Sequence, residues 1–395
     1  MRILLINDYA TPTAGAEIML LLLRDELKQR GHDVRVFATR AQLIPGESYA
    51  DYTCFGTTTR WQVLTSTVNV SAWWNLRRVL RSFRPEMVHV KMFLWQLSPA
   101  IMPLLRNWPS LYHVVIYKAV CPLGSKMLPD GSLCTFRPGV ACHAHGCLTW
   151  RSWAPMMVQR ILFRRWRSVF DVFVANSEAT RQRLLEDGVE PVRVMANGTP
   201  PRGQRPPLNG PPILAYAGRL SPEKGVGTLL RAFAGLQESV PEARLWVVGE
   251  GPEEGPLRSL ASDLGISARV EFFGSMSRKD LEVQFDAAWV QIIPSLWEEP
   301  FGMVAVEALM RGTAVIASNA GGLRDIIRPN AGVLVPPGDV PALTEALHRL
   351  ATNRNLCEQL GEMGRRIALA EYTAEAHADG IEAIYRSATG GFVRR

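Results

Sequence analysis

The sequence predicts an α/β protein made of two doubly wound domains, each a parallel sheet with helices on both faces. At 395 residues the chain is longer than one hydrophobic core usually serves. Strand-like and helix-like segments alternate along it, which is the rhythm of βαβ units. Residues 199–212 contain six prolines and two glycines, a composition that excludes regular structure and indicates a linker between the domains.

The first half opens with this alternation. Residues 3–7 are expected to form a strand, residues 17–29 a helix that stops at Gly31, and residues 34–38 the next strand. Ligands of doubly wound sheets bind outside the carboxyl ends of the strands. We therefore expect a ligand cleft between the two domains.

After the linker, the strand-like residues 212–217 lead into the turn GRLSPEKG at 218–225 and then into a helical segment. Arg219 and Lys224 flank the part of this turn made by Ser221 and Pro222, so both cations can reach one anion. Arginine offers a planar fork and lysine a point charge, a combination suited to a diphosphate. The alternative is a basic turn that is simply solvated.

The stretch EPFGMVAVE, residues 299–307, places Glu299 just before a helix expected over 302–310 and Glu307 within it. Gly312 suits the left-handed position that closes such a helix. The free N–H groups near residues 301–304 and the helix dipole favour a negative ligand. A nucleotide-sugar fits both features, with hydroxyls for the acids and a diphosphate for the helix end. The alternative is two unrelated glutamates.

Together, and in this order, the two stretches resemble the C-terminal domain of glycosyltransferase family 4, retaining enzymes of the GT-B fold. Residues 247–257, 270–281 and 314–327 are similar to further segments of that family, and 174–184 resembles the end of its first domain. The resemblance implies two Rossmann-like domains, an acceptor-binding one at 1–205 and a nucleotide-sugar-binding one at 206–375. It also implies that a C-terminal helix, within 376–395 and its flank from residue 374, crosses back to the first domain.

The resemblance implies transfer of a hexose-type sugar from a nucleotide-diphosphate donor, such as a UDP-sugar, to a lipid, glycan or small-molecule acceptor. It assigns the leaving diphosphate to Arg219 and Lys224, the sugar hydroxyls to Glu299 and the ribose hydroxyls to Glu307. No Asp-x-Asp motif stands in a matching place, so no metal or other cofactor is expected in catalysis. The remaining predicted donor contacts are Gly15, Gly218, Phe301, Gly302, Met303 and Val304.

The chain departs from the family at the acceptor side. Many relatives end a strand in His-Asp before a Cys-Pro pair, and here those two positions are Val115 and Ile116. His113 either serves in the missing catalytic role or faces the interior. Gly15 likewise stands alone where the family often has two adjacent glycines. A nucleotide-sugar hydrolase or epimerase of the same fold, and a non-catalytic nucleotide-binding partner subunit, therefore remain alternatives.

Four of the six cysteines lie within 27 residues, with His143 and His145 among them. A cytosolic compartment argues against disulfides, and the spacing lacks the two-residue knuckle usual for zinc. A structural zinc, plain thiols, and an iron–sulfur or disulfide state all remain open. The four candidate ligands are Cys121, Cys134, Cys142 and Cys147.

The net charge of +7 and the pI near 9.2 indicate an anionic partner. Residues 150–170 combine three Trp, two Phe and five Arg without an acid. As a helix they either contact an anionic membrane or pack on the sheet with a wet arginine face. The chain opens as a strand rather than a secretory signal. A cytoplasmic protein is expected, in solution or on the inner face of the membrane, without a nucleic-acid partner.

Overall fold

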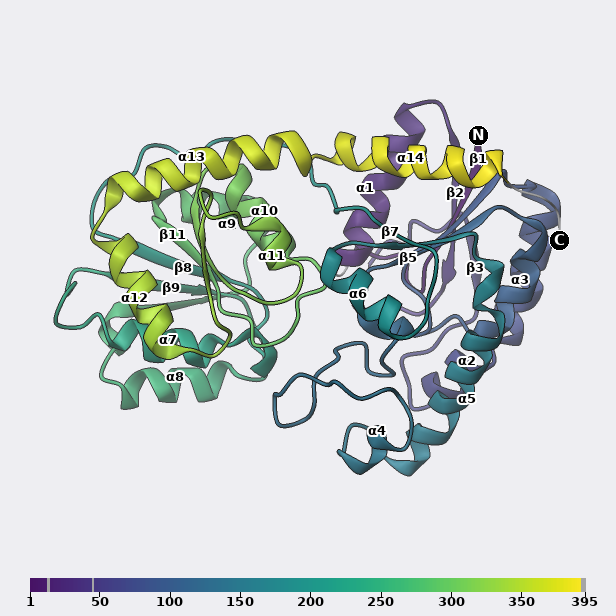
Figure 1. The fold of residues 1–395 in the computed structure, drawn as a ribbon, viewed down its shortest axis with the longest axis horizontal. Helices are drawn as coiled ribbons and strands as arrows, with labels where there is room; N and C mark the ends of the chain where they lie inside the picture. The colour runs from purple at the N-terminus through teal and green to yellow at the C-terminus, as the bar shows by residue number, and fades with distance from the viewer. Residues whose placement is uncertain (13–14, 45, 392–395) are drawn as a thin grey trace. The chain divides into compact units, whose positions relative to one another are not determined.

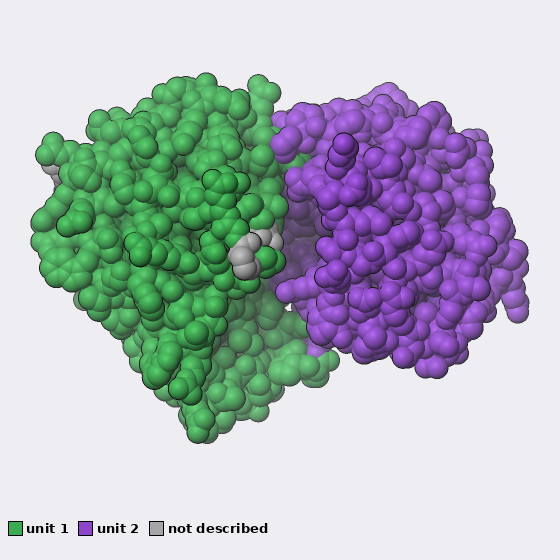
Figure 2. All heavy atoms as spheres, turned by 180° about the vertical axis from the view of Figure 1, so that it is seen from behind, with its two compact units in different colours: residues 1–130, 134–199, 374–395 green, residues 131–133, 200–373 purple. Residues whose placement is uncertain are grey.

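The computed structural model describes residues 1–12, 15–44 and 46–391. The chain divides into two compact units (Figure 2). Unit 1 comprises residues 1–130, 134–199 and 374–395, and unit 2 comprises residues 131–133 and 200–373. The boundary lies close to the one expected after residue 205.

Unit 1 is built on seven strands in the order β3-β2-β1-β4-β5-β6-β7, and every neighbouring pair is parallel. Most of their residues are buried, because helices cover both faces of the sheet and both sets of alternating side chains enter a core. The strands are β1 (Arg2–Ile6), β2 (Asp33–Thr39), β3 (Tyr52–Cys54), β4 (Met87–Val90), β5 (Ser110–Val114), β6 (Val172–Ala175) and β7 (Val192–Val194).

Two helical layers cover this sheet (Figure 1). On one face, α1 (Gly15–Gln29) and α14 (Ala374–Gly390) pack side by side over the strands. On the other face lie α3 (Val70–Phe83), the 3-10 helix η1 (Pro99–Asn107) and α5 (Trp150–Trp166). The remaining helices of the unit are α2 (Gln62–Thr67), α4 (Ala141–Ala144) and α6 (Glu178–Glu186).

Unit 2 has six parallel strands in the order β10-β9-β8-β11-β12-β13. The strands are β8 (Ile213–Ala217), β9 (Arg244–Val248), β10 (Val270–Gly274), β11 (Val290–Ile293), β12 (Ala314–Ser318) and β13 (Val333–Val335). The helices are α7 (Val226–Ala234), α8 (Glu254–Asp263), α9 (Arg278–Gln284), α10 (Met303–Met310), α11 (Leu323–Ile326), α12 (Val340–Ala351) and α13 (Arg354–Glu371).

In each unit the first strand lies inside the sheet, and the strand order reverses beside it. In unit 2, β9 flanks β8 on one side and β11 flanks it on the other. Such a switch point leaves a crevice beyond the carboxyl ends of the two strands, which is where doubly wound sheets bind ligands. The loops that carry Lys224 and Glu299 both start at these strand ends.

The alternation expected from the sequence is present in both units. Residues 200–212 contain neither helix nor strand, as the proline-rich composition predicted. The helix expected over 302–310 is α10, beginning at Met303, and the expected C-terminal helix is α14, which belongs to unit 1. Among the described residues, no helix is long and apolar enough to cross a membrane.

Candidate functional site

The candidate site of unit 2 begins where the chain leaves β8. Gly218 follows the strand with a φ of 158°, and Gly249 follows the neighbouring β9 with a φ of 136°. A Cβ on Gly249 would lie 1.9 Å from the carbonyl oxygen of Gly218. The two turns therefore approach each other at a distance that only glycine permits.

The next turn brings the end of β8 against the end of β11. Pro222–Lys224 forms a single 3-10 turn that ends at Gly225, whose φ is 69°. A Cβ on Gly225 would lie 2.0 Å from the carbonyl oxygen of Pro294, the residue that follows β11. This close backbone contact places Lys224 beside the loop that carries Glu299.

Lys224 and Glu299 form an ion pair in this position. Lys224 Nζ donates to Glu299 Oε1 over 2.6 Å, and the hydroxyl of Ser295 donates to the same oxygen over 2.8 Å. Glu299 is buried, while Lys224 keeps part of its side chain exposed and lies 5.2 Å from the centre of the Trp297 ring. The pair holds one cation and one acceptor at fixed places at the switch point.

Arg219 extends towards solvent from the same turn. Its side chain is 69% exposed and donates to Glu223 over 3.1 Å, and Ser221 donates to that carboxylate over 2.7 Å. Burial acts to raise the pKa of Glu223, but the hydrogen bonds from Ser221 and its own backbone and the charges of Arg219 and Lys224 leave it lowered. Glu223 is therefore a carboxylate that orients Arg219.

The helix end expected after Glu299 is present. The backbone N–H of Gly322 donates to the Glu299 carbonyl over 2.7 Å, which fixes the loop before α10. Gly302 caps the helix with a φ of 118° and no side-chain hydrogen bond. The first N–H to bond to the Gly302 carbonyl is that of Ala305, over 3.0 Å. The N–H groups of Met303 and Val304 precede it and have no carbonyl partner within the helix.

Glu307 contacts two arginines that the sequence analysis did not connect to it. Its Oε1 accepts from Arg202 over 2.9 Å and from Arg278 over 3.1 Å. Arg202 also pairs with Glu282, so the carboxylate belongs to a network that extends from the linker to α9. A ribose hydroxyl would have to share this carboxylate with the two guanidinium groups.

The arrangement in unit 2 can bind a ligand with two kinds of polar group. Arg219, Lys224 and the start of α10 offer positive charge and N–H donors, which suit phosphate oxygens. Glu299 and Glu307 offer carboxylate acceptors, which suit sugar hydroxyls. Ser295 and Trp297 were missed by the sequence analysis, because nothing in their local pattern distinguishes them from loop residues.

His113, predicted as a catalytic candidate, lies in the interior of unit 1. It is fully buried on β5, and its ring lies between His89 at 5.5 Å and His377 at 5.8 Å, measured between ring centres. Burial, and then the charge of Lys91, lower its pKa well below the usual value. The second of the two sequence readings, a histidine that faces the interior, describes its position.

Gly15 is the exposed first residue of α1, and Ala14 before it lies outside the described residues. Val115 follows β5 and is buried. At the end of β1, Asp8 accepts hydrogen bonds from the backbone N–H groups of residues 95–97, and burial raises its pKa to about 7. The sequence analysis did not identify this buried carboxyl.

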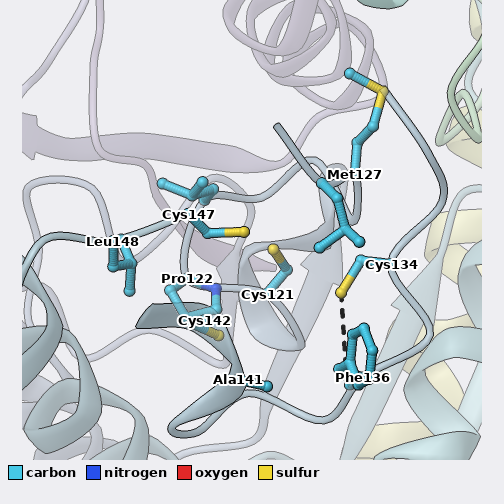
Figure 3. Close-up of a pocket in the computed structure, with 11 residues that line it drawn as sticks. Cys121, Pro122, Met127, Cys134, Phe136, Ala141, Cys142, Cys147 and Leu148 are labelled. Atoms are coloured by element: carbon cyan, nitrogen blue, oxygen red, sulfur yellow. Dashed lines mark hydrogen bonds between the residues drawn. The ribbon is translucent and has the colours of Figure 1, made fainter. Parts of the chain in front are cut away.

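The four clustered cysteines line one small apolar pocket in unit 1 (Figure 3). Its volume is about 20 Å³, which holds little more than one water molecule. Burial raises the pKa of Cys142 and of Cys147, which favours the neutral thiol in the metal-free protein. In the described part of the chain no three Cys, His, Asp or Glu side chains are arranged to hold a metal ion. The suggested structural zinc finds no support here.

A helix that binds a membrane through its arginines would expose all of them, and α5 does not. Arg160 is buried and pairs with Asp187, and it also donates to the carbonyl of Ala119. Arg167, directly after the end of α5, contacts the same aspartate. These two side chains tie α5 to the turn after α6, so part of the predicted membrane surface is a packing surface.

Each half of the chain matches a known family of proteins. The sequence profile of the glycosyl transferases group 1 matches residues 202–367, and that of glycosyltransferase family 4 matches residues 13–202. An MMP alpha-(1->4)-mannosyltransferase of Mycolicibacterium hassiacum is 36% identical over 45% of this chain and 43% of its own. A phosphatidyl-myo-inositol mannosyltransferase of Mycobacterium leprae is 32% identical over 58% of this chain and 63% of its own. The alignment thus spans about half the length of these curated relatives.

Solved structures agree over almost the whole chain. Sucrose-phosphate synthase from Thermosynechococcus elongatus superimposes with a TM-score of 0.74 at 23% identity, covering 99% of this chain and 100% of its own. HepE of Anabaena, solved with UDP and glucose, gives 0.70 at 18% identity over 98% and 100%. These likenesses confirm the predicted fold class of two Rossmann-like domains.

Proposed function

The chain belongs to glycosyltransferase family 4, with the group 1 domain over residues 202–367, and on that premise we propose that it is a glycosyltransferase. It moves a hexose-type sugar from a nucleotide-diphosphate donor to a lipid, glycan or small-molecule acceptor. The donor lies at the switch point of unit 2, beyond the ends of β8 and β11.

The observation that carries this proposal is the fixed pair of Lys224 and Glu299. A lysine held beside a buried carboxylate provides a cation for the leaving diphosphate and an acceptor for a sugar hydroxyl at adjacent places. The Arg219 side chain, exposed and oriented by Glu223, supplies a second cation with a planar fork. The N–H groups at the start of α10 add partial positive charge towards the same phosphate.

The proposed chemistry is retaining. As the bond between the anomeric carbon and the diphosphate breaks, negative charge grows on the leaving group, and Arg219, Lys224 and the helix end stabilise it. The acceptor hydroxyl attacks from the face that the leaving group departs, and a phosphate oxygen takes its proton. The cationic side chains take the place of a divalent metal, so no metal is required. His113 is left out of this chemistry, because it lies in the interior of unit 1.

The donor base and sugar are tested by binding. A ligand that binds only the folded state raises the melting temperature, by an amount that grows with its concentration over Kd. UDP-, GDP-, ADP- and dTDP-sugars are therefore compared for thermal stabilisation. HepE was solved with UDP and glucose, which makes UDP-glucose the first donor to try. A donor panel without any stabilisation would contradict the proposal.

Turnover separates the proposed transferase from its alternatives. Val115 and Ile116 stand where many relatives have His-Asp, which motivates a non-catalytic partner subunit, and a hydrolase or epimerase of the same fold is the alternative among enzymes. Donor consumption is measured with and without acceptors. Consumption that depends on acceptor supports transfer, acceptor-independent consumption supports hydrolysis or epimerisation, and binding without consumption supports the partner subunit.

Lipid-linked acceptors deserve the first trials. The relative from Mycobacterium leprae is described as acting on phosphatidyl-myo-inositol, and this chain carries a net charge of +7. We propose that it works in the cytoplasm at an anionic membrane surface.

A further inference from the structure

The carboxylate of Glu307 is held at only one of its two oxygens. Its Oε1 accepts hydrogen bonds from Nη2 of Arg202 over 2.9 Å and from Nη2 of Arg278 over 3.1 Å. Within the described residues Oε2 accepts no hydrogen bond, and the side chain of Glu307 is 24% exposed. Each carboxylate oxygen can accept about two hydrogen bonds. The two guanidinium groups therefore occupy one oxygen and leave the other available to a ligand.

The two arginines hold this oxygen in different ways. The side chain of Arg202 is only 9% exposed, and its planar fork spans two carboxylates, with Nη1 on Glu282 and Nη2 on Glu307. Arg278, the first residue of α9, is 46% exposed. An exposed ion pair contributes little, whereas breaking a buried one leaves a charge without its partner. Arg202 is thus the group that fixes Oε1 in place.

Arg202 has a fixed position although it lies in the proline-rich linker, outside any helix or strand. Its backbone carbonyl accepts a hydrogen bond from Nη1 of Arg365 on α13 over 2.8 Å. Three residues on, the backbone N–H of Arg205 donates to the carbonyl of Arg311 over 2.9 Å, and its guanidinium pairs with Glu358 at 2.8 Å. The linker is therefore fastened to unit 2 on both sides of the Arg202 side chain's contact with α10.

We propose that Arg202 is a positioning residue for the donor. It holds Oε1 of Glu307 so that Oε2 accepts the ribose hydroxyls of the nucleotide, and it thereby sets the preference of the site for a ribonucleotide. A carboxylate that is fixed before the ligand arrives loses no further side-chain freedom on binding. Arginine is required because a lysine brings a point charge and cannot span two carboxylates. The inference rests on the donor site proposed above and adds to it a residue that does not touch the donor.

The test compares the affinity of the whole protein for UDP and for 2′,3′-dideoxyUDP, which lacks both ribose hydroxyls, by titration calorimetry. The wild type is expected to bind UDP about 10- to 100-fold more tightly, the value of hydrogen bonds to a charged group. Arg202→Gln should lower this ratio on the order of tenfold, towards the value of an ordinary hydrogen bond. The loss should fall on UDP and leave the affinity for dideoxyUDP near that of the wild type. If the donor panel selects another base, the two forms of that nucleoside diphosphate replace the uridine pair.

Arg278→Gln is the matched control, because it removes an arginine from the same carboxylate oxygen. It should change the ratio by less than about fivefold, the upper value for an exposed ion pair. Arg202→Lys keeps the charge but loses the fork, so its ratio should still lie below that of the wild type. In a Glu307→Gln background, Arg202→Gln should change the ratio no further, since it acts through that carboxylate.

The possible failures are distinct. A wild-type protein that binds none of the nucleoside diphosphates would overturn the proposed donor site, and this inference with it. A wild type that binds UDP while Arg202→Gln keeps the full ratio, or binds UDP more tightly, would overturn the role of Arg202 alone. So would an equal or larger loss in Arg278→Gln, or a further loss in the Glu307→Gln background. Should Arg202→Gln fail to fold, Arg202→Lys decides the same question.

Discussion

Glu299 and Glu307 stand in different surroundings, and the difference has kinetic consequences. Glu299→Gln and Lys224→Ala remove the proposed partners of the reacting end of the donor, where charge develops in the transition state. We expect kcat to fall, because the activation free energy should rise by about 2–4 kcal/mol. Glu307→Gln removes the proposed contact to the ribose, which is similar in ground and transition states, so it should mainly raise the donor KM.

Steady-state kinetics on these three variants, with Arg219→Ala beside them, make the measurement. Arg219→Ala should behave like Lys224→Ala, since we propose that both cations contact the leaving diphosphate. Wild-type rates in Glu299→Gln and Lys224→Ala would remove the pair from the chemistry and leave a nucleotide-binding partner as the better description.

Gly225 is required by its backbone conformation and by its contact. A side chain there meets the carbonyl oxygen of Pro294 at 2.0 Å and must adopt a φ of 69°. Gly225→Ala should therefore lower the free energy of unfolding by at least about 1–2 kcal/mol, the cost of a left-handed residue with a Cβ. It should also weaken donor binding, because it separates Lys224 from Glu299.

Gly255→Ala is the control for this change. Gly255 lies in α8 with open space around its Cβ position and no positive φ, and Ala is preferred over Gly in a helix by about 1 kcal/mol. Denaturant unfolding of the two variants should thus shift in opposite directions. A Gly225→Ala protein as stable as the wild type would show that the turn is not constrained as described.

Local pattern predicted the residues of the two turns but not their partners. Lys224 and Glu299 were each assigned to a ligand, and their mutual hydrogen bond spans 75 positions. It exists because β8 and β11 are neighbours in the sheet, which no local spacing reveals. Glu307 and Arg202 are 105 positions apart for the same kind of reason. The alternative for His113 was open because a single histidine in an apolar strand gives no sign of what packs on it.

At the scale of elements, α14 places a histidine against two others in the core of unit 1. Nδ1 of His89 forms a hydrogen bond of 2.7 Å with the hydroxyl of Tyr385, and Nδ1 of His377 lies 2.7 Å from the carbonyl oxygen of Ala196. Burial, followed by the charge of Lys91, lowers the pKa of His89 and His113 well below normal and that of His377 to about 3. These lowered pKa values favour the neutral form of all three rings in the folded protein.

This core predicts acid sensitivity. Below pH ~6.5 the unfolded chain binds protons at these histidines and the folded chain does not, so stability falls with pH by up to about 1.4 kcal/mol per unit for each. Asp8 has the opposite effect on stability. Because its pKa is raised to about 7 in the folded protein, the folded chain keeps a proton that the unfolded chain releases. The net expectation is a loss of roughly 3 kcal/mol per pH unit below pH 6, measured by urea unfolding at several pH values.

His113→Phe tests the assignment, because phenylalanine keeps an aromatic ring in the stack and cannot be protonated. Its stability should depend on pH less steeply, by about 1.4 kcal/mol per unit. An unchanged slope would mean that His113 is already protonated in the folded protein or exposed to water. The family resemblance implied the helix α14, but it did not predict that His377 would face two histidines from β4 and β5.

At the scale of the whole molecule, the proposed site needs no divalent metal. Donor turnover should therefore survive excess EDTA at short times, because Arg219, Lys224 and the end of α10 take over the role of the metal. The control is a second aliquot with chelator and added Mg²⁺ or Mn²⁺. Loss of turnover that these ions restore would contradict the proposal. Slow loss during long exposure would report on stability and not on the reaction.

The chain length, the alternation of strands and helices and the proline-rich linker were enough to predict the two-domain fold. The alternation and the linker are read from residues that are close together in the chain. Family resemblance carried the function further than composition did. The placement of charged surfaces was not predictable in this way. Residues 150–170 were an attractive membrane helix by composition, yet Arg160 faces Asp187 across a turn.

The position of α14 also has a consequence for biosynthesis. Its buried side chains, including Ala378, Ile381 and Tyr385, complete the core that β1 and α1 begin, so unit 1 is the first to emerge from a ribosome and the last to be finished. With synthesis at 5–20 residues per second, the 174 positions from 200 to 373 impose a wait on the order of ten seconds or more. During that interval the part of this core that α14 covers stays open, and a nascent protein in this state is a natural client for chaperones.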